Sequence, residues 1–390
     1  MLTLMIAVIT LNGSLTSTAL RDVIVKTAHD FRQAVGEAKP GDTIRISAGD
    51  YAGSFYFETV HGKSGKPIII AAADPRNPPE FTGTLHFSEV SHLELRGLTF
   101  RGAKGNALNI DDGGTYETPS HHVTLRNLRI LDSGSGGNQD GIKLSGVDHV
   151  QIEDCEVAGW SEGGSAIDMV GCHNGKIERC RFRRGGNGIQ AKGGSASIVI
   201  NKCRFEHCSS RGINLGGSTG MDYFRPPVKS MPPNEKYEAK GIIVMYCVFV
   251  GGGAPLAFVG VDAATVRHCT IYRPGRWVVR LLQETREPGF IPSRKCSFRE
   301  NIVVFRSTSW SEGGVNIGSG TESTNLRFRQ NFWYCEDRPD RSRPTLPTPE
   351  EGAFFYGVDP LFRNPEQGDF TLMPTSAAFG RGAYPDPVKK

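Results

Sequence analysis

The chain has 390 residues, of which 38% are apolar, 48 are glycine and 23 are proline. This composition allows a large core but places turns throughout the chain, so it favours many short strands over long helices. The formal net charge of only +4 gives no strong basic field, and we therefore exclude a nucleic-acid-binding protein.

The first 20 residues have the character of a leader segment. An apolar run from Leu2 to Thr10 is too short to span a bilayer, and small polar residues follow it as far as Ala19. The pattern resembles a signal peptide without its usual basic start. We accordingly expect a secreted or periplasmic protein that does not interact with membranes.

The segment "TAHDFRQAVGEAKPGD" predicts a helix near the start of the chain. Thr27 is placed as an N-cap with Asp30 three residues later, and Phe31, Ala34 and Val35 form an apolar stripe. A Pro-Gly pair ends the pattern. Such a helix can cover the open end of a stack of strands.

Two short motifs then recur in step along the chain. "GIKLSG", "AIDMVG", "GIQAKG", "GINLGG" and "PLAFVG" end in glycines that are 25, 22, 24 and 43 residues apart. These glycines are Gly146, Gly171, Gly193, Gly217 and Gly260. A repeat of this size with short alternating strands is about one coil of a parallel β-solenoid, and the long interval indicates an insertion.

The second motif aligns cysteines and asparagines in one column. Its members are Cys155, Cys180, Cys203, Cys247 and Cys269, extended by Asn127, Asn301 and Asn331. The chain has nine cysteines, an odd number, so they cannot all pair with one another. We interpret the column as an internal ladder of buried free thiols, with disulfides as the less favoured alternative.

These repeats resemble the right-handed parallel β-helix proteins of the pectin-lyase-like superfamily. The N-terminal "GDTIRISAGDYAG…GKPIIIAAADP" is similar to the opening of the chondroitinase B and alginate lyase group. The resemblance implies an all-β, single-stranded parallel β-helix (solenoid) with an N-terminal capping helix. We expect one monomeric domain over residues 21–390, with caps at about 21–60 and 345–390 and a loop insertion at about 218–240.

Strand alternation identifies the side chains that point out of this solenoid. In "GIQAKG" the apolar Ile189 and Ala191 point inward, so Gln190 and Lys192 point outward. Coils stack about 4.8 Å apart, so outward residues of successive repeats become neighbours. The predicted column contains Asn109, Lys143, Asp168, Gln190 and Asn214, and its edge contains Asp140, Asn187 and Arg211.

The mixed composition of this column favours a binding site, because a merely solubilising face would be rich in Lys, Glu and Thr. The alternative is an ordinary set of cross-strand pairs, each worth roughly 0.2–1 kcal/mol.

In the insertion, Tyr223, Phe224 and Arg225 are expected to form a substrate-binding wall, although a flap that only packs on the solenoid would also fit. Arg280 is expected in a far wall or, equally, in an ion-pair network.

The resemblance further implies an anionic polysaccharide substrate cleaved by β-elimination. This reaction needs a base for the C5 proton and neutralisation of the uronate carboxylate. Lys192 is the predicted base, with Arg211 and Asp168 as its catalytic partners. Lys143, Asn187, Gln190 and Asn214 are predicted to bind the substrate.

The motifs of the lyase group are incomplete in this sequence. Lys192 in "GIQAK" stands where the group has a lysine in "EIISxK". Gly216 stands where the arginine of its "FRHG" would be, and Asn187 replaces its first glutamate. A calcium-assisted mechanism therefore does not carry over, although Asp111, Asp140 and Asp168 are candidate ligands for Ca²⁺.

Two other functions remain open. A glycoside hydrolase would use Asp140 and Asp168 as a carboxylate pair about 5–9.5 Å apart, although the polygalacturonase signatures are missing. A non-catalytic carbohydrate-binding β-helix would use the same groove. His121, His122 and His173 flank turns and lack the spacing of metal ligands, so we do not predict a histidine zinc site.

Overall fold

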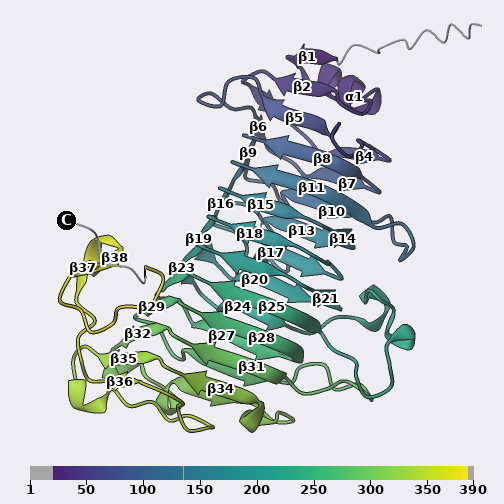
Figure 1. The fold of residues 1–390 in the computed structure, drawn as a ribbon. Helices are drawn as coiled ribbons and strands as arrows, with labels where there is room; N and C mark the ends of the chain where they lie inside the picture. Colours follow the sequence, from purple (N-terminus) through teal and green to yellow (C-terminus); the bar gives the residue numbers. More distant parts are fainter. Residues whose placement is uncertain (1–20, 135, 385–390) are drawn as a thin grey trace, which may run out of the picture.

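The dominant feature of the chain is a long stack of parallel coils (Figure 1). The structure is a computed structural model that describes residues 21–134 and 136–384. The predicted leader, residues 1–20, lies outside the described residues. Within the described ranges, no helix combines the length and apolar character needed to cross a bilayer.

Each coil contributes strands to three parallel sheets, here called A, B and C. Sheet A contains β1 (Asp22–Val25), β2 (Thr43–Ile46), β5 (Ile68–Ala72), β8 (Ser91–Arg96), β11 (Ser120–Arg126), β14 (Val147–Asp148), β15 (Gln151–Glu153), β18 (Lys176–Glu178), β21 (Ser195–Ala196), β22 (Val199–Asn201), β25 (Ala239–Met245), β28 (Val261–Arg267), β31 (Arg294–Arg299) and β34 (Leu326–Arg329). Sheet B contains β3 (Asp50–Tyr51), β6 (Glu80–Phe81), β9 (Thr99–Arg101), β12 (Arg129–Leu131), β16 (Glu156–Ala158), β19 (Arg181–Gly185), β23 (Arg204–Cys208), β26 (Val248–Val250), β29 (Thr270–Tyr272), β32 (Ile302–Phe305), β35 (Phe332–Cys335) and β36 (Phe355–Tyr356).

Sheet C is the sheet predicted to carry the site. It contains β4 (Phe55–Glu58), β7 (Leu85–Ser88), β10 (Leu108–Asp111), β13 (Ile142–Ser145), β17 (Ser165–Val170), β20 (Asn187–Lys192), β24 (Arg211–Gly216), β27 (Ala254–Val259), β30 (Val279–Leu282) and β33 (Val315–Ile317). Short 3₁₀ helices occur at Met221–Tyr223, Val228–Ser230, Ser307–Ser309, Glu312–Gly314, Ser323–Asn325, Pro339–Arg341 and Pro365–Gln367. The predicted right-handed parallel β-helix is confirmed.

The N-terminal helix is α1 (Ala28–Gly36), as predicted. The Thr27 side chain accepts a hydrogen bond from the backbone N–H of Asp30 at 3.1 Å. Phe31, Ala34 and Val35 are buried against the first coils, because a solenoid must cover its apolar end.

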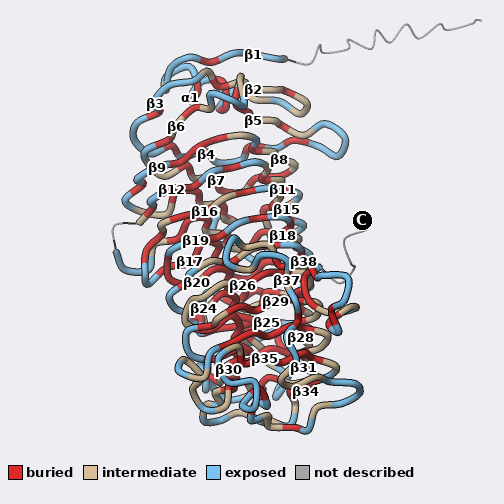
Figure 2. The backbone as a smooth tube through the Cα atoms, turned by 90° about the vertical axis from the view of Figure 1, so that its left-hand side faces the viewer, coloured by how far each residue is buried: buried red, intermediate tan, exposed pale blue. Residues whose placement is uncertain are grey.

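The interior is filled by ladders of like residues. Figure 2 shows buried residues along the stacked strands and exposed residues concentrated in the loops. Ile142, Ile167, Ile189 and Ile213 occupy one register position of sheet C and are fully buried. This follows from the alternation of the repeats, since every second side chain of a strand points to the same face.

The cysteine ladder is confirmed, with one correction. All nine cysteines are buried and free. The backbone N–H of Cys155 donates to Sγ of Cys180, and that of Cys269 donates to Oδ1 of Asn301. Asn127 was placed one position too late in the alignment: Leu128 faces Cys155, because Arg126 pairs with Glu153 and Arg129 with Glu156.

The C-terminal segment does not simply close the last coil. Glu350 covers that coil, since its carboxylate accepts hydrogen bonds from Asn331 and from Trp333 Nε1. The hairpin of β37 (Phe362–Asn364) and β38 (Asp369–Leu372) instead lies along sheet B, at the side of the stack (Figure 1). Phe370 packs there with Tyr272, whose ring centroid is 5.1 Å away.

Candidate functional site

The predicted outward column of sheet C is present with the expected register. Asn109 pairs with Lys143 and Lys143 with Asp168 in successive coils. Asp168 pairs with Gln190, and Gln190 with Asn214. Sequence alternation and the glycine spacing therefore placed these five side chains correctly.

The middle of this column is buried, although its side chains point away from the solenoid core. Asp168 is 0% exposed, and Gln190 and Asn214 are also buried. The Gln190 amide donates to Ser165 Oγ at 2.7 Å, and the Asn214 amide donates to Gln190 Oε1 at 2.8 Å. These two amides therefore bond to neighbouring coils rather than to solvent.

A chain of alternating charges links three coils. Lys143 donates a hydrogen bond to Asp168 and lies 3.8 Å from Asp140. Nζ of Lys192 lies 3.5 Å from the other carboxylate oxygen of Asp168. Asp140 in turn accepts a 2.8 Å hydrogen bond from the backbone N–H of Ser165. The buried carboxylate of Asp168 thus lies between two lysines.

Two neighbouring members of this charge network, Asp140 and Lys143, both have raised pKa values, but for different reasons. Burial, and then the nearby charge of Asp168, raises the pKa of Asp140 to about 7. Burial alone would lower the pKa of Lys143, but Asp168 and Asp140 outweigh it and hold the pKa above its usual value. Asp140 therefore titrates near neutrality, and Lys143 stays cationic.

The insertion packs closely against the glycines at the ends of the repeated strands. A Cβ at Gly171 would lie 2.6 Å from Cβ of Arg225, and one at Gly146 would lie 2.2 Å from the Arg225 guanidinium. A Cβ at Gly194 would meet the carbonyl oxygen of Arg225 at 2.2 Å. Only glycine allows the loop to approach this closely, so the repeat glycines form the seat of the insertion.

A cavity of about 1100 Å³ lies between the insertion and the ends of the sheet C strands. Lys143 and Lys192 line it from the solenoid, and Lys229 and Lys236 line it from the insertion. Tyr116, from the loop after β10, lines it as well. An anionic ligand in this cavity would therefore meet cations on two sides.

The three insertion residues predicted to bind substrate have different surroundings. Tyr223 lines the cavity and is 72% exposed. Phe224 lines the cavity as well, but it is 3% exposed and packs edge-on against Phe290 at 5.3 Å, so it offers no open face to a sugar ring. Arg225 is buried 3.2 Å from Asp112 and donates to the carbonyl of Tyr116 at 3.0 Å. Phe224 and Arg225 therefore hold the wall in place.

Arg211 does not approach Lys192. It lies at the start of β24, whereas Lys192 ends β20, a separation of five residues or about 16 Å along the strand direction. Its guanidinium donates to Asn214 Oδ1 at 2.9 Å and to Glu284 at 2.6 Å. Asn187 lies at the same end of the sheet. The predicted pairing of Arg211 with Lys192 is wrong.

Arg280 continues the column two coils beyond Asn214, because Asn214 pairs with Ala257 and Ala257 with Arg280. It donates to Asn316 Oδ1 at 3.0 Å and lies over the ring of Trp277. Burial lowers the pKa of Arg280. Arg280 is therefore held by an amide and an aromatic ring, and its contacts are neither those of the predicted ion-pair network nor those of an open wall.

The three aspartates proposed for calcium are engaged separately. Asp111 accepts from His86 Nε2 and Ser88 Oγ, both at 2.6 Å, and these bonds outweigh burial and lower its pKa. Asp140 and Asp168 belong to the lysine cluster. Among residues 21–134 and 136–384, the one set of three ligand groups with donor atoms within 4.8 Å of one another is His92, His121 and His122.

Several residues at or near the cavity had no sequence signal outside the insertion. Glu238 does not line the cavity but is fully buried at the foot of the insertion, where it accepts from the N–H groups of Gly193 and Thr219 at 2.9 and 3.1 Å. Asp112 was visible only as half of an Asp-Asp pair. Both residues act on the loop, and no repeat pattern reveals a partner that is distant in sequence.

Comparisons with known proteins agree with this architecture. A family profile described as "Right handed beta helix region" matches residues 114–275. No curated protein matches the sequence. The fold is that of the pectin-lyase-like right-handed parallel β-helix superfamily, as predicted.

Solved structures share the fold at low sequence identity. A mannuronic acid specific polysaccharide family 6 lyase from human gut microbiota is 15% identical with a TM-score of 0.53, over 89% of this chain and 84% of that one. The PL6 family alginate lyase AlyGC is 15% identical with a TM-score of 0.50, over 95% of this chain and 58% of that one. The pectate lyase Pel9A is 14% identical with a TM-score of 0.50, over 77% and 73%.

Proposed function

We propose that this protein is a carbohydrate-active enzyme that binds an anionic polysaccharide in the cavity beside sheet C and cleaves it by β-elimination. The observation that carries the proposal is the pair of lysines, Lys143 and Lys192, that flank Asp168 and line one cavity. The carboxyl of Asp140 also lies beside Lys143, but its pKa of about 7 leaves it partly protonated near neutrality, so the two amine groups are not fully paired with anions and can face the carboxylate of a uronate.

The division of roles differs from the one expected from the sequence. Lys143 takes the place assigned to Arg211, because its raised pKa keeps it cationic next to the cavity. It binds the uronate carboxylate and makes the C5 proton more acidic. Lys192 acts in its free-amine form, while Lys143 keeps the positive charge beside Asp168. The amine takes the C5 proton, and the ammonium so formed can return a proton to the leaving oxygen. Asp168 positions both side chains.

The insertion supplies the rest of the binding surface. Tyr223 presents an exposed ring on which a sugar can stack, and Lys229 and Lys236 add positive charge. Arg225 anchors this wall through Asp112. The groove therefore fits an extended anionic chain that is held from two sides.

A second candidate is a glycoside hydrolase, which one observation favours. The pKa of Asp140 is raised to about 7 next to Asp168, and a protonated carboxyl beside a second carboxyl is the arrangement of a general acid and its partner. In this reaction Asp140 would protonate the leaving oxygen.

The experiment that separates the two is a substrate panel. The protein is incubated with alginate, polygalacturonate, chondroitin and a neutral glucan, while ultraviolet absorbance of unsaturated products and reducing ends are recorded together. Both signals on a uronate polymer support the lyase. Reducing ends without absorbance contradict it in favour of the hydrolase, and neither signal with measurable binding leaves a carbohydrate-binding protein.

A further inference from the structure

The histidines of this chain gather at one corner of the solenoid. Six of the ten lie where the chain enters sheet A in successive coils, and two register columns contain them. The members are His61, His121 and His173 in one column, and His92, His122 and His149 one residue later.

Three of these rings form a parallel stack. The centroid of His122 lies 4.6 Å from that of His92 and 4.7 Å from that of His149, with interplanar angles of 24° and 26°. All three residues have φ near +50°, at the bend that each coil makes there. Stacking of like residues is the ordinary behaviour of a solenoid turn, and alone it suggests no ligand.

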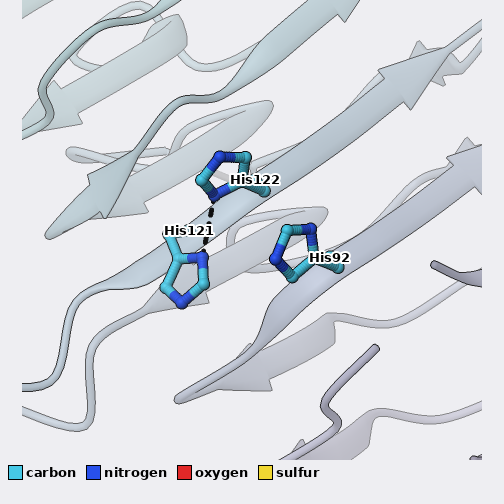
Figure 3. A group of neighbouring side chains, drawn as sticks. All are labelled: His92, His121 and His122. Carbon is cyan, nitrogen blue, oxygen red and sulfur yellow. Dashed lines mark hydrogen bonds between the residues drawn. The ribbon is translucent and has the colours of Figure 1, made fainter. Parts of the chain in front are cut away.

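His121 belongs to the neighbouring column, and its ring lies across the stack. The ring plane is nearly perpendicular to those of His92 and His122, at 89° and 86°. Its Nδ1 lies 2.9 Å from Nδ1 of His122, so one imidazole can donate a hydrogen bond to the other. The three rings offer nitrogens that all lie within 4.8 Å of one another (Figure 3). This orientation brings ring nitrogens of both columns together at one point.

The distance between the ring nitrogens is close to the distance between two ligand atoms of a metal site. Zn–N bonds of about 2.0–2.1 Å at a tetrahedral centre place two ligand nitrogens about 3.3 Å apart. The His121–His122 separation differs from this value by only a few tenths of an ångström, and rotation of the His92 ring can close the remainder. Imidazole ligands select Zn²⁺, Ni²⁺ or Cu²⁺ over Ca²⁺ and Mg²⁺.

The polar groups next to the three histidines are paired with other residues, so the fourth position of a tetrahedral site would be left for solvent. Asp148 lies beside His121 in register, but its carboxylate is 3.0 Å from Nδ1 of His173. His61 Nδ1 lies 3.1 Å from Ser91 Oγ. His122 is exposed, so an ion can reach the three rings from outside.

We propose that His92, His121 and His122 bind one divalent transition-metal ion of the Zn²⁺ class. The ion links β8 to β11, two consecutive coils of sheet A. His121 is the second residue of β11 and follows the loop that joins β10 to β11. That loop carries Tyr116, which lines the cavity. The ion would therefore also fix the far end of that loop. This site is independent of the reaction proposed above.

The test is titration of the metal-free full chain with ZnCl₂ by calorimetry, and with CoCl₂ by visible absorption. We expect one ion per chain. His121→Gln, His92→Asn and His122→Asn should each weaken binding at least about 10-fold, a loss that even an outer partner of a ligand can cause. Asn tolerates the positive φ of the last two positions, so these variants should fold.

His149→Asn is the matched control, because it removes a ring of the same stack at the same bend and leaves all three proposed ligands present; it stacks on His122 just as His92 does. We expect its Zn²⁺ affinity to stay close to that of the wild type. Equal losses for His149→Asn and His121→Gln would overturn the proposal in favour of a diffuse histidine surface. Absence of a one-to-one endpoint in the wild type, or displacement of Zn²⁺ by equimolar Ca²⁺, would overturn it as well.

Discussion

The ammonium nitrogen of Lys192 lies 3.5 Å from a carboxylate oxygen of Asp168, which belongs to the preceding coil. The other oxygen of that carboxylate binds Lys143, one coil further back. Because Asp168 is inaccessible to solvent, the two lysines provide the charge that its burial requires. Both lysines also line the cavity, so the same contacts that stabilise Asp168 orient the proposed base.

Lys192→Met should lower turnover of a uronate polymer by roughly 10²–10⁴-fold, the usual contribution of a general base. Methionine keeps an unbranched stem where the Lys192 side chain packs against Gly217. Lys229→Met, on the exposed part of the same cavity, is the control and should mainly raise KM. Near-normal turnover in Lys192→Met together with loss in Asp140→Asn would transfer the chemistry to the carboxylates.

Asp140 should give stability a distinct pH dependence. Its pKa is about 7 in the folded chain against an ordinary value of 3.8, so the folded state holds a proton that the unfolded state has lost. The resulting stabilisation is complete below about pH 4 and is lost as the pH rises through about 7, by on the order of 4 kcal/mol.

Asp140→Asn removes this titration while retaining an acceptor for the Ser165 N–H. Urea unfolding of both proteins between about pH 4 and 8 should therefore show a difference in unfolding free energy that changes steadily between about pH 4 and 7 and levels off above about pH 7. Asp222→Asn, an exposed carboxylate of the insertion, controls for the change of net charge. A pH-independent difference would mean that Asp140 is ionised throughout.

Gly171→Ala should displace the insertion. The added methyl group would lie 2.6 Å from Cβ of Arg225, and the residue has φ +60°. Gly102→Ala is matched in conformation, with φ +65°, but its methyl group would meet no atom within 4 Å. Both should lose roughly 1 kcal/mol from backbone strain. Only Gly171→Ala should also weaken polymer binding and speed proteolysis within residues 218–240.

Substitutions of the two aromatic residues of the insertion should affect different properties: polymer binding at Tyr223 and stability at Phe224. Tyr223→Ala removes an exposed ring and should weaken polymer binding with a change in unfolding free energy of at most about 0.5 kcal/mol. Phe224→Ala removes a buried ring that packs on Phe290, and should cost about 3 kcal/mol. Calorimetric melting together with affinity electrophoresis would test both. Equal stability of the two variants would show that Phe224 is not part of a packed core.

Much of the fold follows from the sequence because each coil repeats the same local pattern. Ile189 and Ile213 could be paired from alternation alone, and Thr27 could be recognised as an N-cap from its spacing to Asp30. Arg211 was correctly placed at the edge of the column with Asn187, but its role was assigned wrongly. Five residues of strand separate this edge from Lys192, so the residue type suited the chemistry while the position did not.

The remaining features depend on contacts between distant segments. The burial of Phe224 requires Phe290, and the histidine trio requires His92 and His121 to meet from coils about 30 residues apart. A signal for the trio was present, since "VSHLEL" and "PSHHVTL" align one coil apart with His92 over His122. Searching for metal ligands by spacing along the chain misses this type of site, because its ligands come from neighbouring coils.

Glu238 holds the start and the end of the insertion together through hydrogen bonds. Its carboxylate accepts from Gly193 before the loop, from Thr219 at the loop's first turn, and from Thr285 two coils later. The solenoid register on either side, from β24 to β25 and onward, is set by strand pairing that the loop does not share. The wall of the cavity is therefore not needed for the pairing of these strands. The residues between Met221 and Lys236 form this wall, whereas the lysine cluster beneath them is built by strand pairing and ion pairs within the solenoid, so the wall and the cluster are held by separate contacts.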